Sequence, residues 1–559
     1  LYICSVFILG GMTSCEDFLD KREDVGLTED DIFRDYYSLR GFLDQSFNQL
    51  ENVMVMDNWE NGRAFVGLFA DEMATTDNSS AVFTLHSGNW LSNAKSNKTF
   101  EIGNAGSTAI SRSYKALRIN NRIINDIDKA PLTPEQKNEI LGQAYFYRSW
   151  FYFQIIKRYG GMPIIDKVFE GGDDDIPRMT YHESHDWMME DIQKAIYMLP
   201  DSWDDPNYGR PTKIAAMALK EWAQLFDASP LMQNDLNSTE NKGYDTERAK
   251  SAAKSAYEVI RYMDGSKSAP YPYGLASKEE YTNVFYFKYP PVHQPEYIWV
   301  KRQFPNAANQ NQKRTIRTFW QYEDLAFGSG PDGNSMCCPS LNIVNMFDKK
   351  GADGIYYPID DPRSGYALDY DHKPFEDRDP RFYNNILLPG TTWGHYADGR
   401  TYYITTYKGG AAYQHMLTQK DCNKRMFTGF MCKKFMWPEC NQYLEKNNPN
   451  CWWDYRFLTI YIRASQIYLD YAEALFEGCG SATATIEGCP ISAAEAINIL
   501  RRRIGLTDLP SDIVADPDKF RAAYRRERAV ELMFENHRWW DIRRWMILEE
   551  TFKDTYPIK

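Results

Sequence analysis

Apolar residues recur every three or four positions through several long segments, which is the spacing of one face of an α-helix. Residues 139–159 show the pattern clearly, and it stops at Gly160 and Gly161 before Pro163. The apolar positions of that segment are Ile140, Ala144, Tyr147, Phe151 and Ile155. The same spacing predicts further helices over residues 180–200, 213–228, 247–263, 460–477, 493–504 and 520 to about 550.

Caps and small residues refine these helices. Thr180 stands three residues before Glu183, a capping box that marks where its helix begins. In residues 213–228 and 247–263, alanine occupies many of the apolar positions, which lets paired helices approach closely. Helix pairs with small residues at the contact and aromatic residues at the ends are typical of tetratricopeptide-like hairpins, although no regular repeat period is visible here.

Residues 276–455 have a different texture. They hold 13 of the 27 prolines and six of the 15 tryptophans, with turn dipeptides such as Pro389-Gly390. Loops and short strands fit this composition better than helices do. We therefore expect a mainly α-helical protein: an irregular tetratricopeptide-like scaffold over residues 15–275, an inserted loop-rich, short-strand ligand-binding module over 276–455, and helices over 456–559 that complete the scaffold.

Charge and aromatic content narrow the class of partner. The chain has 559 residues and a net charge of −13, which argues against nucleic acid because phosphate binding depends on clustered Lys and Arg. Its 38 Tyr, 30 Phe and 15 Trp amount to 15% of the residues. This is more than a core of this size demands, so we expect many rings to lie at or near the surface.

The N-terminal residues predict export. Residues 1–11 are apolar and uncharged but shorter than the ~20 residues that span a membrane. Residues 1–14 are therefore expected to be part of a lipoprotein signal peptide. Cys15 follows small residues and precedes acidic ones, so we expect it to be lipidated and to anchor the protein on the outer face of the outer membrane, by lipid only. The alternative is an ordinary signal peptide with an incidental cysteine.

The other cysteines give a weaker signal. None of them forms a C-x-x-C pair, which disfavours zinc. Cys479 and Cys489 flank one loop and are the most local candidates for a disulfide. Free thiols are an equal alternative, and the spacing does not decide between them.

Two groups of residues could carry chemistry. Glu527 and Glu531 lie one helical turn apart, a separation compatible with a retaining glycosidase, but the arginines on the same helix predict buried ion pairs instead. His182 and His185 beside Asp186 could bind a metal, yet they share the first turn of a capped helix and lack a third ligand with recognisable spacing. We therefore expect no catalytic residue, no metal centre and no cofactor, and calcium has no supporting motif.

Exposed rings and amides on loops favour carbohydrate as the ligand. Sugars present flat C–H faces and a rim of hydroxyls, which aromatic rings and Asn, Gln, Asp or Arg side chains complement. Covering ~50 Å² of ring contributes on the order of 1 kcal/mol, so two or three rings give roughly millimolar to micromolar affinity. Such weak sites suffice for a polymer that repeats its epitope.

Several segments together resemble the SusD/RagB family of surface glycan-binding lipoproteins. They occur in the family's order along nearly the whole chain, which makes their joint occurrence specific. The segments are residues 15–19, 69–73 (Phe-Ala-Asp-Glu-Met), 210–213, 226–231, 378–382 (Arg-Asp-Pro-Arg-Phe), 464–475 and 527–545. The resemblance implies a helical fold with four tetratricopeptide-like units, no catalysis, and a position as a lid over a SusC-like TonB-dependent transporter that imports oligosaccharides.

The resemblance also indicates where a glycan would bind. In the family, ligand aromatics come from the loop after the Asp-Glu segment and from the module ahead of residues 339–347. The candidates that this sequence offers there are Trp90 with Asn93, and Trp320 with Tyr322 and Arg317. Trp393, in a Gly- and Thr-rich loop, is a reserve candidate. Trp299 lies in an alternating, strand-like segment, so we expect it in the core.

The expected function is therefore capture of a polysaccharide or oligosaccharide at the cell surface. One alternative is a tetratricopeptide-type scaffold for protein partners, in which the inserted module would be incidental to ligand affinity. A glycoside hydrolase is less favoured, because the sequence lacks a recognisable catalytic constellation.

Overall fold

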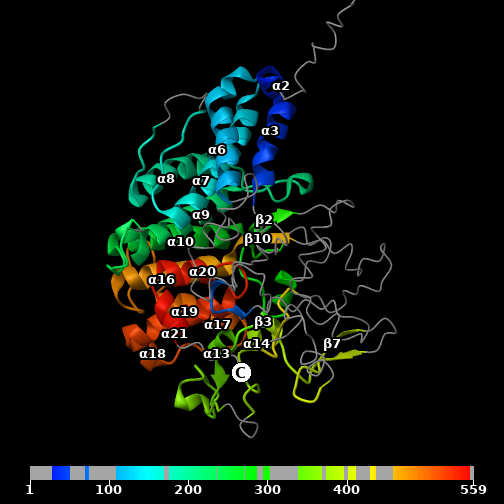
Figure 1. Ribbon diagram of the computed structural model, residues 1–559, viewed down its shortest axis with the longest axis vertical. Helices are drawn as coiled ribbons and strands as arrows, with labels where there is room; N and C mark the ends of the chain where they lie inside the picture. The colour runs from blue at the N-terminus through cyan, green and yellow to red at the C-terminus, as the bar shows by residue number, and fades with distance from the viewer. Residues whose placement is uncertain are drawn as a thin grey trace, which may run out of the picture.

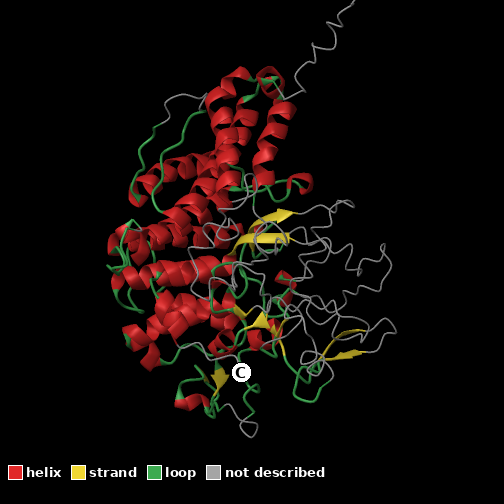
Figure 2. Cartoon of the chain, in the orientation of Figure 1, coloured by secondary structure: helices red, strands yellow, loops and turns green. Residues whose placement is uncertain are grey.

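Helices and strands occupy opposite sides of the molecule. The computed structural model describes residues 28–50, 69–74, 109–168, 175–235, 237–269, 271–285, 294–302, 338–367, 373–395, 401–410, 428–435 and 458–553. Helices stack along one side from the top to the bottom of Figure 1, and the short strands gather on the other side, as Figure 2 shows. The mainly α-helical class predicted from the sequence is confirmed.

The N-terminal helices pack in consecutive pairs. Helix α6 packs on α7, α7 on α8, α8 on α9, and α9 on α10. Their bounds, with those of the two helices before them, are α2 (Glu29–Phe33), α3 (Tyr36–Gln49), α6 (Ala109–Asp126), α7 (Pro134–Tyr159), α8 (Tyr181–Met198), α9 (Lys213–Ala228) and α10 (Thr246–Gly265). Helix α10 packs equally closely on α16 (Ala464–Cys479), so both halves of the chain share one stack of helices (Figure 1).

Side-chain caps set the starts of the helices. The predicted capping box of α8 is present, with Thr180 Oγ1 accepting from the Glu183 N–H and Glu183 Oε2 accepting from the Thr180 N–H at 2.9 Å. Helix α7 begins at Pro134, ahead of the predicted start at residue 139. A second capping box, formed by Thr133 and Gln136, accounts for the earlier start, because it satisfies the first backbone N–H groups.

Two predicted C-terminal helices are partly wrong. Residues 460–463 belong to strand β10 (Leu458–Arg463), which pairs antiparallel with β2 (Tyr297–Arg302). Every residue of β10 is buried. A strand covered on both faces has a continuous run of apolar residues instead of alternating apolar and polar ones. The predicted helix over 520–550 is three helices, interrupted first where Phe534 and Asn536 adopt φ values of 63° and 68° and again where Met546 adopts a φ of 56°. The helices after α16 are α17 (Ala493–Arg503), α18 (Ser511–Ala515), α19 (Pro517–Glu531), α20 (Arg538–Arg544) and α21 (Leu548–Lys553).

The described elements between residues 303 and 457 are short. Two helices, α13 (Leu341–Met346) and α14 (Pro380–Asn385), alternate with strands that pair in twos. The pairs are β1 (Met73–Ala74) with β3 (Cys338–Pro339), β4 (Lys349–Lys350) with β5 (Tyr356–Tyr357), β6 (Ile386–Leu387) with β9 (Met431–Cys432), and β7 (Thr392–His395) with β8 (Thr401–Tyr403). Loops and short strands are therefore observed here, as the proline content predicted.

Aromatic rings fill the core of the scaffold. The ring of Trp299 lies 4.7 Å from that of Trp150, 4.8 Å from that of Phe146 and 4.6 Å from that of Tyr461, and its predicted place in the core is confirmed. The expectation of many rings at or near the surface is met mostly by half-buried rings, such as those of Tyr145, Trp187 and Trp203. Among the described residues, the large hydrophobic side chains that are exposed are Tyr37, Tyr197, Tyr383, Tyr403 and Tyr407.

Two further observations concern the cysteines and the membrane. Cys479 and Cys489 are free thiols, so the disulfide considered for them is not formed and the alternative holds. None of the described helices combines the length and the hydropathy that a bilayer crossing requires.

Candidate functional site

A hairpin of the inserted module presents tyrosine rings to solvent. We call residues 390–395 and 401–407 the tyrosine hairpin; they comprise β7, β8 and the turn that follows β8. Tyr403 and Tyr407 are 47% and 44% exposed. An exposed phenol ring offers one face for stacking and a hydroxyl at its edge, which suits a ligand with both apolar and hydroxyl surfaces.

Backbone pairing places the reserve candidate Trp393 on the strand opposite Tyr403. Thr392 pairs with Tyr403, and Trp393 is the next residue along β7. The hairpin begins at Gly390, whose φ of 84° suits glycine, and the Gly390 N–H donates to the Ile404 carbonyl at 2.8 Å. The end of the hairpin that carries Tyr403 is thus closed by backbone hydrogen bonds on both strands.

Exposed aromatic residues concentrate in the inserted module. Among the described residues, five large hydrophobic side chains are exposed, and three of them, Tyr383, Tyr403 and Tyr407, belong to this module. Tyr383 lies on α14, and Lys433 beside β9 donates to its carbonyl at 2.6 Å. The other two, Tyr37 and Tyr197, lie on α3 and α8 of the scaffold.

A buried ion-pair network fixes the inserted module to the scaffold. Arg381 of α14 donates to Glu527 Oε1 at 2.5 Å and to Glu531 Oε2 at 2.9 Å, both on α19. Arg463 and Arg503 bind the other oxygen of Glu531 at 2.8 and 2.6 Å. The buried ion pairs predicted for Glu527 and Glu531 are thereby confirmed, but the arginines that form them lie on α14, β10 and α17 rather than on the same helix.

The network also sets the charge of Glu531. Burial alone would raise the pKa of its carboxyl, but Arg503, Arg463 and Arg381 together lower that pKa well below its usual value. The general acid of a glycosidase needs the reverse, a raised pKa and access to the substrate. The arrangement around Glu531 therefore suits a structural role.

A second buried contact joins the segment of residues 69–73 to the segment of residues 527–545. Asp71 accepts from Arg538 at 2.7 and 2.9 Å, and Glu72 Oε1 accepts from the Phe534 N–H at 3.1 Å. Directly after them, β1 pairs with β3 of the inserted module. Motif residues far apart in the chain are therefore buried against one another, where they hold the fold together.

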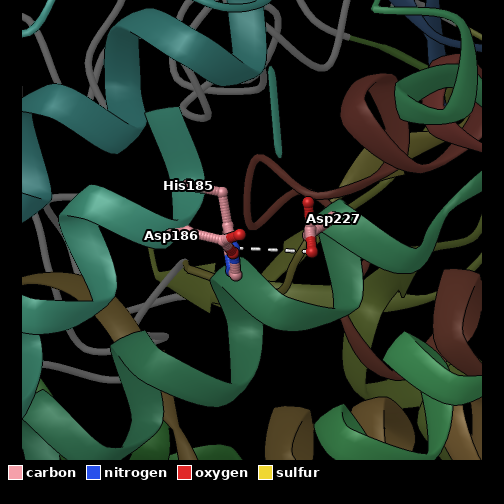
Figure 3. Close-up of side chains that lie close together, drawn as sticks. All are labelled: His185, Asp186 and Asp227. Atoms are coloured by element: carbon pink, nitrogen blue, oxygen red, sulfur yellow. Dashed lines mark hydrogen bonds and ion pairs between the residues drawn. The ribbon is translucent and has the colours of Figure 1, made fainter. Parts of the chain in front are cut away.

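Two histidines of α8 meet an aspartate of α9, as Figure 3 shows in part. His182 Nδ1 lies 2.6 Å from Asp227 Oδ1, and His185 Nδ1 lies 2.9 Å from Asp186 Oδ1 and 3.4 Å from Asp227 Oδ2. The hydrogen bond from His185, with that from Arg248, lowers the pKa of Asp186 to about 2. Arg248 also donates to Asp227 Oδ2, so its guanidinium already supplies the positive charge that a metal ion would bring. The sequence did not identify Asp227 as a third member because it lies on another helix.

The predicted glycan contacts fall mostly outside the described residues. Those outside are Trp90, Asn93, Arg317, Trp320 and Tyr322, together with the lipidation candidate Cys15. Of Trp393 the backbone is described, and it lies in β7. The exposed Tyr403 and Tyr407 were not predicted. They stand in a segment without periodicity, where the only available signal was the tyrosine content of a Gly-rich stretch.

Comparisons with known proteins agree with this architecture. A family model described as SusD family matches residues 295–557, and a second, described as starch-binding associating with outer membrane, matches residues 17–221. A SusD-like protein from Bacteroides fragilis has a similar structure, with a TM-score of 0.67 and 23% identity over 93% of this chain and 88% of its own. No curated protein matches the chain.

Other solved structures have the same fold at lower identity. A SusD-like carbohydrate binding protein from Bacteroides fragilis has a TM-score of 0.66 and 20% identity, over 93% of this chain and 88% of its own. A SusD homolog from Bacteroides thetaiotaomicron has a TM-score of 0.60 and 18% identity, over 93% and 88% of the two chains. The two family models together span most of the sequence, and both describe SusD-like proteins. This protein belongs to the SusD/RagB family.

Proposed function

We propose that this protein is a lipid-anchored, non-enzymatic protein of the outer membrane that captures a polysaccharide or oligosaccharide and delivers it to a SusC-like TonB-dependent transporter. The observation that carries the proposal is the exposure of Tyr403 and Tyr407 on the tyrosine hairpin. The family description that names starch binding and the outer membrane supports it, as does the similar structure described as carbohydrate binding.

The proposal gives each part of the chain a task. Residues 276–455 form the binding module, held on the helical scaffold of residues 15–275 and 456–559, and lipidated Cys15 keeps both at the membrane. Because the ion pairs of Arg381 tie α14 of the module to α19 of the scaffold, the loops near the hairpin stand on a rigid support. A fixed support lowers the entropy lost when a flexible glycan binds.

Affinity electrophoresis in gels that contain single polysaccharides tests the binding role. We expect Trp90→Ala and Trp320→Ala together to abolish retardation by the target polysaccharide without changing the melting temperature. Tyr197→Ala is the matched control, because this ring is 84% exposed on α8 of the scaffold. Unchanged retardation of the double variant would refute the contact residues, whereas absence of retardation of the wild type by any polysaccharide would favour the protein-interaction scaffold.

The non-enzymatic part of the proposal has its own measurement. Purified protein is incubated with each polysaccharide that it binds, and new reducing ends are followed over time. We expect no growth, because Glu527 and Glu531 are buried and bound by arginines. Sustained product formation would overturn this part while leaving glycan binding intact.

A further inference from the structure

A second aromatic pocket lies between the scaffold and the first residues of the inserted module. It opens between the loop before α9, the loop after α10 and the first residues of β2, and it encloses about 510 Å³ of space including its open mouth. Its aromatic lining consists of Trp203, Tyr208, Tyr271, Tyr273, Tyr297 and Trp299. We call it the scaffold pocket. Strand β2 lies well above β7 in Figure 1, so the pocket is separate from the tyrosine hairpin.

We propose that the scaffold pocket binds one sugar residue of a neutral saccharide. The inference rests on the proposed function and adds to it a second contact with the same class of ligand. The chemistry of its lining identifies the ligand class.

Charge in the pocket selects a neutral ligand. Among the described residues that line it, Arg210 is the only one with a charged side chain. The Arg210 guanidinium lies 2.7 Å from Asp44 Oδ1 and donates to Gln143 Oε1 at 3.0 Å, so the protein itself already compensates its charge. An acidic sugar would meet no uncompensated cation in this described lining, and it would lose its hydration without an ion pair in return.

The lining offers both kinds of contact that a sugar needs. Four of its rings are half-buried, which leaves part of each ring accessible from the pocket: Trp203, Tyr208, Tyr271 and Tyr273. Ser202 and Gln294 add a hydroxyl and an amide to the same lining. Rings cover the apolar C–H faces of a sugar, and hydroxyl and amide groups bond to its hydroxyls.

The two loops of the pocket are held in place by the protein. The Trp203 indole Nε1–H donates to the Pro211 carbonyl at 2.8 Å, which fixes the ring in the loop before α9. Ser266 Oγ accepts from the Tyr273 N–H at 2.9 Å, which fixes the loop after α10. Because these contacts exist without ligand, little ordering opposes binding.

The test uses variants of the full chain that change only the pocket. Ser202→Trp places an indole at the exposed mouth, and Trp203→Ala removes a lining ring; either suffices should the other fold poorly. Ser238→Trp, in an exposed loop outside the pocket, is the matched control. Maltohexaose, cellohexaose and xylohexaose are the neutral probes, and a galacturonate hexamer is the charged one. Dissociation constants and hydrogen–deuterium exchange in residues 202–212 and 271–276 are measured.

We expect a neutral hexasaccharide to slow exchange in both segments of the wild type and of Ser238→Trp, and the galacturonate hexamer to leave them unchanged. Ser202→Trp should remove this protection and weaken binding by about five-fold, because its indole blocks the pocket and the glycan loses this one contact. A neutral probe that binds the wild type without slowing exchange there, and binds Ser202→Trp equally well, overturns the pocket inference alone. If no neutral probe binds the wild type, the pocket inference fails, whereas the proposed function fails only if no polysaccharide retards the wild type in affinity electrophoresis.

Discussion

The scaffold and the inserted module use aromatic residues in opposite ways. In the scaffold, Phe153 and Phe226 pack edge to face at 5.3 Å and are almost fully buried. In the inserted module, Tyr403 and Tyr407 keep nearly half of their surface exposed. Paired helices cover their apolar stripes with each other, whereas a two-stranded hairpin has no second layer to cover its rings. The same residue type thus stabilises one region and is available for binding in the other.

The two regions depend on each other through buried charge, and breaking that link should have the largest effect. Glu531→Gln removes the charge that Arg381, Arg463 and Arg503 share. We expect a loss of about 3–5 kcal/mol in the free energy of unfolding, because three buried guanidinium groups then lack part of their compensation. Chemical denaturation at pH 7 measures the loss.

Glu495→Gln is the control for this variant. Glu495 pairs with Arg502 on the surface, where both side chains are more than 40% exposed, and exposed pairs contribute about 0–1 kcal/mol. Equal losses from the two substitutions would show that the module does not depend on the buried network. Acid should reproduce the effect. At pH values above the usual pKa of a glutamate, the lowered pKa of Glu531 stabilises the fold. That stabilisation is lost as the pH falls through the pKa of Glu531 in the folded state.

The buried carboxyl of Glu72 gives a second test, because its pKa is shifted in the opposite direction to that of Glu531. Burial raises the pKa of Glu72 to about 8, so the folded protein holds a proton that the unfolded chain releases above about pH 4.5. Stability should therefore fall as the pH rises through the folded-state pKa. Glu72→Gln removes the titration, so we expect the variant to gain on the wild type by on the order of 1 kcal/mol per pH unit between pH 5 and 8.

Denaturation of both proteins at pH 5, 6.5, 8 and 9 gives the difference directly. Above pH 8 it should become constant, because both states of the wild type are then ionised at this residue. Glu258→Gln, on an exposed face of α10, should show no such trend. If the difference in free energy of unfolding between Glu72→Gln and the wild type did not change with pH, Glu72 would be ionised in the folded protein. That outcome would contradict the raised pKa expected of a buried carboxyl with one backbone hydrogen bond.

Much of the scaffold was predictable because its helices carry their own periodicity and caps. Thr180 and Glu183 form their capping box within four residues, so the sequence contains the whole signal. Strand β10 was missed because a continuous apolar run fits a helix or a covered strand equally well. Its partner β2 lies far away in the chain, and the pairing of Ile460 with Val300 decides between the two.

The candidate sites were less predictable for the same reason. His182 and His185 were found as neighbours in sequence, but Asp227 and Arg248 reach them only through the packing of α8, α9 and α10. Exposure is likewise a property of the assembled structure. Nothing local in the sequence separates an exposed tyrosine such as Tyr403 from a buried one.

The smallest expected effect concerns the exposed rings themselves. Tyr403→Ala and Tyr407→Ala should each weaken binding of the target polysaccharide by about five-fold, because each removes a ring contact on the order of 1 kcal/mol. Stability should change by no more than about 0.5 kcal/mol, since the rings contribute little to the core. Tyr403→Phe keeps the ring face and should bind as the wild type does if stacking is the dominant contact.

Affinity electrophoresis of the wild type and these three variants, with Tyr197→Ala beside them, measures these differences. Equal binding by all of them would place the glycan elsewhere on the inserted module, while a loss shared by Tyr197→Ala would assign binding to the scaffold as well and remove the contrast between the two regions.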